Sequence, residues 1–222
     1  TFTFAGTEFT PTGLQNGETI GSVALVSAGQ AATAGVAGGP YAIVAGNATG
    51  GTFNTGNYAI TYVDGHLTVN PADVVVTALG GSSVYGQSPT NPGISAAGLQ
   101  NGQDVSVLNG LSNSFGIGPT TSVAGGPYTL SVLGTLTNVN YAITTRNTDT
   151  WVVTPAPITV TANGGTSVYG SSPTNPGISA AGLQNGQGIS ALTGLYNSFG
   201  ITNLTGVGNH TLAVAGMLTN PN

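Results

Sequence analysis

The feature that most constrains this chain is an internal repeat with an offset of 84 residues. The run from Ser88 to Gln103 returns letter for letter from Ser172 to Gln187, and Gly80–Gly86 returns with one substitution as Gly164–Gly170. A unit of this length is large enough to bury a small core of its own, unlike a single turn of a solenoid. The repeat therefore predicts a tandem array of small domains.

The repeats also set the expected domain boundaries. Asn70-Pro71-Ala72 and Thr154-Pro155-Ala156 close successive units, so we place repeat 1 at residues 1–72, repeat 2 at 73–156 and repeat 3 at 157–222. Measured against the complete second repeat, the first lacks its N-terminal strand and the third its C-terminal hairpin. Proline stiffens these short junctions, which favours an elongated rod or fibre over a flexible string of domains.

The pattern within a repeat is that of β-structure. Ile158, Val160 and Ala162 alternate with threonines, and residues 58–62 alternate in the same way. Asp64-Gly65 then predicts a tight hairpin into Leu67 and Val69. Residues 104–108 predict a short helical turn with Asn101 near its N-cap. We expect a mainly β fold, either an immunoglobulin-like sandwich or a β-grasp-like sheet with one short helix.

The charge content excludes several classes of function. Only 3% of the residues are charged, the net charge is −5, and lysine is absent. Nucleic acid and anionic lipid both require clustered cations, so neither is an expected partner. The chain has no cysteine and no apolar run of 18 residues, so we expect no disulfide and no membrane insertion. Low charge also leaves little repulsion between copies, which makes self-association easy.

Three motifs resemble the MBG and YDG repeats of very large bacterial surface proteins, such as filamentous-haemagglutinin-type or autotransporter-like adhesins. They are Val-Tyr-Gly at Tyr85 and Tyr169, the central Gly-Leu-Gln-Asn-Gly, and the stretch from Asn57 to Val69. The resemblance implies exported repeats that act as stalks, adhesive modules or matrix scaffolds, and it supplies no catalytic residue. The family often has Asp after Asn-Gly, where this chain has Gln103 and Gln187.

No group of residues predicts a catalytic, cofactor or metal site. His66 and His210 occupy different positions of the repeat, with His210 in the register of Tyr128, and the carboxylates do not recur in register. The aromatic residues do recur, which favours core packing, and an exposed platform for sugar rings is the alternative. Trp151 occurs in one repeat alone and is the candidate ligand-contact residue.

These observations predict a structural segment of a secreted, cell-surface fibre or adhesin, acting as a stalk or biofilm-matrix scaffold, and not an enzyme. The expected partners are tandem neighbours or other copies of the chain. The alternative is a carbohydrate- or host-receptor-binding module that recurs along the chain, with a polysaccharide or host surface as partner. An incomplete terminal repeat also exposes a strand edge. Either the chain is part of a longer one, or subunits complete each other by donating a strand.

Overall fold

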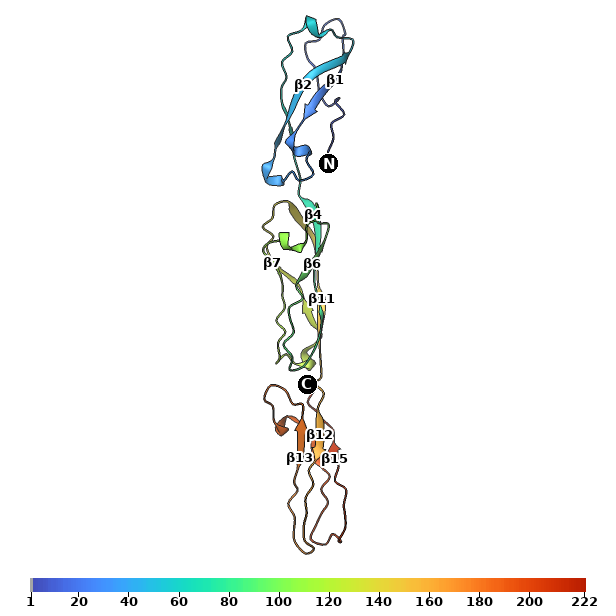
Figure 1. Ribbon diagram of the computed structural model, residues 1–222, viewed down its shortest axis with the longest axis vertical. Coiled ribbons are helices and arrows are strands. Elements are labelled where there is room, and N and C mark those ends of the chain that lie inside the picture. Colours follow the sequence, from blue (N-terminus) through green and yellow to red (C-terminus); the bar gives the residue numbers. More distant parts are fainter. Residues whose placement is uncertain (1) are drawn as a thin grey trace. The chain divides into compact units, whose positions relative to one another are not determined.

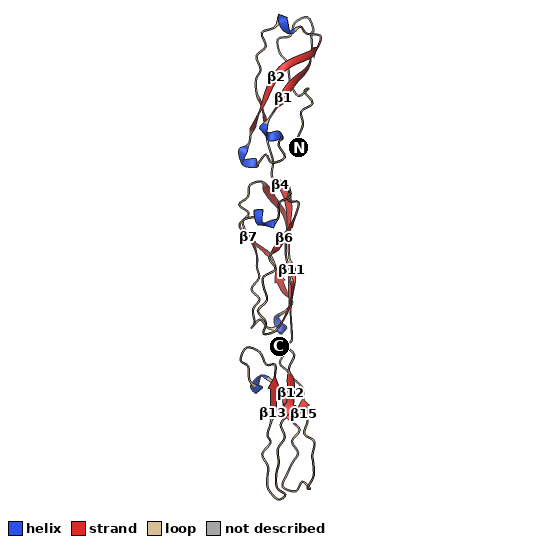
Figure 2. Cartoon of the chain, in the orientation of Figure 1, coloured by secondary structure: helices blue, strands red, loops and turns tan. Residues whose placement is uncertain are grey.

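The computed structural model describes residues 2–222, so the first residue of repeat 1 lies outside it. Short strands and loops make up the chain, and the helices of the described residues are three-residue 3-10 turns (Figures 1 and 2). The mainly β prediction is therefore confirmed. The strands are β1 (Ile20–Val26), β2 (Tyr41–Gly51), β3 (Gly65–Leu67), β4 (Ala72–Ala78), β5 (Gly81–Val84), β6 (Ile94–Ala97), β7 (Leu111–Asn113), β8 (Tyr128–Leu130), β9 (Val132–Gly134), β10 (Tyr141–Asn147), β11 (Asp149–Thr154), β12 (Thr159–Ala162), β13 (Ile178–Ala181), β14 (Leu195–Asn197) and β15 (Val214–Gly216). The 3-10 turns are η1 (Ala28–Gln30), η2 (Val36–Gly38), η3 (Thr55–Asn57), η4 (Val105–Val107), η5 (Val123–Gly125) and η6 (Ile189–Ala191).

The chain forms two compact units, and each takes part of the second repeat. Unit 1 comprises residues 1–77, 94–112 and 133–147, and unit 2 comprises residues 78–93, 113–132 and 148–222. The second repeat is divided between the two units because its first and last segments pair twice. Strand β4 pairs with β10 in unit 1, and β5 pairs with β11 in unit 2. The repeat boundaries proposed from the sequence remain a prediction.

Unit 1 contains two three-stranded sheets, ordered β1-β2-β3 and β10-β4-β6. The strands of the first sheet are antiparallel, and the register between β1 and β2 shifts between Ser22 and Ala24. In the second sheet, β10 runs parallel to β4. Strand β4 buries Val74, Val76 and Ala78 on alternate positions, as expected of a strand with one face in the core.

Unit 2 contains the sheet β5-β11-β8 and the strand pairs β12-β13 and β14-β15. Strand β11 is central in its sheet, parallel to β5 and antiparallel to β8. It buries Trp151 and Val153 and exposes its other four residues. Leu130 of β8 is the other main core residue of this sheet, with 2% of its surface exposed.

The hairpin predicted at Asp64-Gly65, near the end of repeat 1, is wrong. Residues 58–62 form no strand, and β3 begins at Gly65 and pairs with Tyr41–Ile43 of β2. In the second repeat, β10 pairs with β4 and β11 pairs with β5 and β8. The Asp-Gly signal is local, and pairing of Gly65–Leu67 with the more distant strand β2 satisfies the same backbone groups.

The helical turn predicted after Asn101 forms as η4, but its N-cap is Asp104. The carboxylate of Asp104 accepts a hydrogen bond of 2.9 Å from the backbone N–H of Ser106. Hydrogen bonds from Ser106, its hydroxyl first, lower the pKa of Asp104. Asn101 serves a different purpose, because it is part of the preceding Asn-Gly turn.

Candidate functional site: the contacts between successive repeats

The Gly-Leu-Gln-Asn-Gly segment folds into the same turn in all three repeats. Asn16, Asn101 and Asn185 have positive φ angles of 53°, 56° and 54°, and the glycine after each is also left-handed. Two left-handed residues in succession are the pattern of a type I′ turn, which Asn-Gly favours. Each of these asparagines is exposed at the tip of its turn and lies outside the strands.

A tyrosine that directly follows an asparagine, Tyr58 in repeat 1 and Tyr141 in repeat 2, holds this turn in place. The hydroxyl of Tyr141 accepts a hydrogen bond of 3.1 Å from the N–H of Gln100 and donates one to the side chain of Gln103. Tyr58 makes the same pair of contacts in the first repeat, donating to the carboxylate of Glu18. The bond to Glu18 raises the pKa of Tyr58. Two motifs that are more than 40 residues apart therefore form one structural element.

In unit 1, two asparagines of the second repeat bind a loop of the first. The Asn101 side-chain amide donates a 3.1 Å hydrogen bond to the carbonyl of Ala32. The Asn140 side-chain carbonyl accepts one of 2.8 Å from the N–H of Val36, the first residue of η2. One asparagine donates to the loop and the other accepts from it, so together they fix both its position and its orientation.

In unit 2, the third repeat binds the second in the same way. The Asn185 amide donates a 3.0 Å hydrogen bond to the carbonyl of Pro119. Asn222 accepts one of 2.8 Å from the N–H of Val123, the first residue of η5, and one of 2.9 Å from the hydroxyl of Ser122. Asn185 corresponds to Asn101, and Asn222 to Asn140. We call each donor–acceptor pair, Asn101 with Asn140 and Asn185 with Asn222, an asparagine clamp.

Tyr85 adds a further hydrogen bond between repeats 2 and 3 beside the second clamp. Only 7% of its surface is exposed, and its hydroxyl accepts a 3.3 Å hydrogen bond from the side-chain amide of Gln187. The neighbouring Gly86 has a φ of 90°, and a Cβ there would lie 2.5 Å from the side chain of Gln184. The Tyr-Gly motif thus lets the third repeat approach the second closely.

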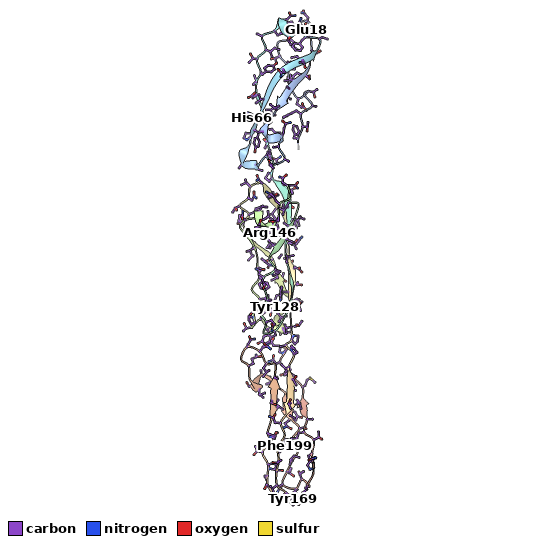
Figure 3. All side chains as sticks on the ribbon, viewed as in Figure 1. Glu18, His66, Tyr128, Arg146, Tyr169 and Phe199 are labelled. Carbon is purple, nitrogen blue, oxygen red and sulfur yellow. The ribbon has the colours of Figure 1, made fainter. Side chains whose placement is uncertain are left out.

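A ring in each repeat holds the loop that the clamp binds. Tyr41 and Tyr128 donate their hydroxyls to the carbonyls of Gly35 and Ser122, at 2.7 Å and 2.5 Å. In repeat 3, His210 takes this place, with 2.9 Å between Nε2 and the carbonyl of Gly206, so that the ring N–H donates. His210 lies outside the strands, where the sequence predicted a strand position, and its acceptor is four residues earlier in the chain, whereas that of each tyrosine is six residues earlier. Figure 3 labels Tyr128.

The residues considered for chemistry in the sequence do not come together. His66 is exposed on β3, and His210 is exposed beside Gly206. Within residues 2–222, no three side chains of His, Asp or Glu are grouped closely enough to hold a metal ion. The same residues include no helix that is long and apolar enough to cross a membrane.

Trp151 lies in the core of unit 2, where 6% of its surface is exposed. Its ring meets Phe115 edge to face at 5.0 Å between centroids, and its Nε1–H donates to the Ser83 hydroxyl at 3.0 Å. Burial of this extent favours packing over contact with a sugar ring, which needs an exposed face. Ligand contact by Trp151 therefore stays a prediction.

Comparison with known families identifies the first repeat. Residues 2–68 match the MBG domain (YGX type). The resemblance predicted from the motifs is confirmed by this match. MBG domains are a non-enzymatic, adhesin-type repeat family. Searches of the curated proteins and of the solved structures found no match.

The sequence did not reveal what the asparagines of the Asn-Gly turns do. Asn101 and Asn185 lie in the run that is identical between repeats 2 and 3, but identity alone does not separate a turn residue from a docking residue. The useful signal is exposure, because neither side chain is needed inside its own repeat.

The clamp predicts slow amide exchange at one residue of each bound loop. We expect the N–H groups of Val36 and Val123 to exchange slowly with solvent, and that of Val207, which is 96% exposed, to exchange fast. Replacing Asn140 with Ala removes the acceptor and should speed exchange of Val36 at least about fivefold. Hydrogen exchange measured by NMR tests this, with Asn57→Ala as the matched control. Equal rates in the wild-type chain and Asn140→Ala would contradict the clamp.

Proposed function

We propose that this chain is a structural segment of an extracellular bacterial fibre or adhesin, in which MBG-type repeats act as a stalk or matrix scaffold. The observation that carries the proposal is the repetition of the asparagine clamp, with the same two hydrogen bonds made by different residues in each unit. A binding module that works alone has no need of this regularity. A spacer does, because one contact rule applied repeatedly produces a regular array.

The chemistry of the clamp suits a position outside the cell. Its bonds join side-chain amides to backbone groups and to the hydroxyl of Ser122, so they involve no charge and are not screened by salt. Nothing in them depends on a titrating group or on a bound ion. Adhesin-type repeats are found on surface proteins, and the family match extends that expectation to this chain. Location at the bacterial surface is thus part of the proposal.

Small-angle X-ray scattering of the chain tests the stalk. A globule of this repeat's length has a diameter of roughly 30 Å, so we expect each repeat to add about 30–45 Å to the maximum dimension. The dimension should not change between low salt and about 0.5 M NaCl, because the clamps are uncharged. As a control, the chain with Asn101→Ala and Asn140→Ala should show a broader distance distribution. A compact particle of roughly spherical profile would overturn the stalk.

A further inference from the structure

The first and last segments of repeat 2 pair side by side, and both of their pairings are parallel. In unit 1, β4 runs parallel to β10 along residues 72–77 and 141–147. In unit 2, β5 runs parallel to β11 along residues 81–84 and 151–154. The chain therefore enters repeat 2 through one strand of each pair and leaves it through the other.

Parallel pairing decides how a pull along the chain acts on these strands. Tension from repeat 1 pulls β4 and β5 toward their starts, and tension from repeat 3 pulls β10 and β11 toward their ends. Because the strands of each pair point the same way, the two pulls are opposite and lie along the strands, so each pair is loaded in shear. The evenly spaced bonds of a parallel pair then share the load and must break together. An antiparallel pairing of the same segments would be peeled apart one bond at a time.

Hydrogen bonds beyond the paired residues extend both pairs at their outer ends. The N–H of Ala72 donates to the carbonyl of Asn140 at 2.9 Å, directly before β10 begins. The N–H of Tyr85 donates to the carbonyl of Thr154, also at 2.9 Å, directly after β5 ends. The bonds that bear the load therefore continue up to the points where the chain enters and leaves the repeat.

Side chains add cross-links between the same segments. The hydroxyl of Thr144, at the point where the register between β10 and β4 shifts, donates to the carbonyl of Val74 at 3.2 Å. In unit 2, the carboxylate of Asp149 accepts a 2.9 Å hydrogen bond from the N–H of Gly80, which precedes β5. A hydrogen bond to a charged acceptor is stronger than one between neutral groups. These contacts must also break before the strands can slide.

Core packing holds the register of both pairs. Val74, Val76 and Ala78 of β4 are 1% exposed or less, and Trp151 and Val153 of β11 are 6% and 4% exposed. Sliding a strand by one residue turns its buried side chains to the opposite face. A pull along either strand must therefore break the backbone bonds and remove these side chains from the core in the same step.

We propose that repeat 2 is a load-bearing element, which resists a pull along the chain through the shear of its two parallel strand pairs. This role goes beyond the proposed stalk, since a spacer keeps a distance whether or not it carries tension. The two proposals are also tested separately. Scattering measures the length of the chain, and pulling measures its resistance to force.

Optical tweezers on the whole chain test the proposal by changing only the direction of the pull. The chain has no cysteine, so two introduced cysteines are unique attachment points for DNA handles. Asn70→Cys with Pro155→Cys loads repeat 2 in shear, because the handles lie before β4 and after β11. Asn70→Cys with Val139→Cys is the matched control, because each handle lies just before β4 or β10 and the pull peels this pair from one end. All three positions are exposed, as is Thr68, which replaces Asn70 as the first handle in a second set of both variants.

We expect the first rupture in shear to need at least about twice the force of the first rupture in peeling, since several bonds share the load in one direction and one bond bears it in the other. Complete opening should lengthen the tether by up to about 3.6 Å for each residue between the handles, which identifies repeat 2 as the part that unfolds. The variants should melt at the same temperature in circular dichroism, so the difference in force comes from direction and not from stability. Equal rupture forces in the two directions, or a lower force in shear, would overturn the proposal.

Discussion

Replacing Trp151 with Ala should lower the free energy of unfolding by about 3–5 kcal/mol, the cost of removing a large buried aromatic side chain. The residue is 6% exposed, packs edge to face on Phe115 and donates to Ser83. All three interactions are lost together, and the open space over Gly81 leaves a cavity. Chemical denaturation followed by circular dichroism measures the loss, because the variant has no tryptophan to report.

Trp151→Phe is the control for this experiment. It keeps most of the buried area and the contact with Phe115 and removes the hydrogen bond to Ser83, so we expect a cost of about 1–2 kcal/mol. A loss below about 1 kcal/mol for Trp151→Ala would show that the side chain is not packed in the core, and it would favour the predicted role of Trp151 in ligand contact.

The second large effect is expected at Asn113, which is 7% exposed. Its side-chain amide donates to the carbonyls of Leu79 and Gly93, at 2.9 Å and 2.7 Å. Gly93 keeps a further bond from the Leu79 N–H. Asn113→Ala leaves the Leu79 carbonyl without its donor, so we expect a loss of about 2–3 kcal/mol in denaturant unfolding.

The repeat provides an internal check. Asn197 is 4% exposed and donates to the carbonyls of Asn163 and Gly177, at 2.9 Å and 2.8 Å. Asn197→Ala should therefore destabilise repeat 3 by the same mechanism. Asn147→Ala, which removes an exposed 3.2 Å bond to Thr77, is the control and should cost less than about 1 kcal/mol. A small effect at both buried asparagines would refute this account of their role.

Much of the fold could be predicted from the sequence because its signals repeat. The alternation at residues 158–162 and the helical turn at 104–108 are local patterns, and both appear in the structure as β12 and η4. The pairing partners could not be predicted. Asp64-Gly65 has the sequence of a hairpin turn, yet β3 pairs with β2, because a strand's partner is set by which faces become buried.

The candidate site was accessible to sequence reasoning only in part. The central Gly-Leu-Gln-Asn-Gly motif and the stretch from Asn57 to Val69 were recognised as family features, and the role of Tyr58 and Tyr141 in holding the turn was not. The clamp depends on contacts between residues 69 and 104 positions apart. Such contacts leave no local pattern, since an exposed asparagine at a turn has the same sequence signature whether or not it binds a neighbour.

The sequence by itself determined that the chain is β-rich, repetitive and poor in charge, because propensity, periodicity and composition are properties of neighbouring residues. Only the tertiary structure decided that β11 is a central strand between β5 and β8 and that Trp151 is buried there. The reason is physical: burial and strand pairing depend on which distant segments meet, and the repeats bring identical residues into different surroundings.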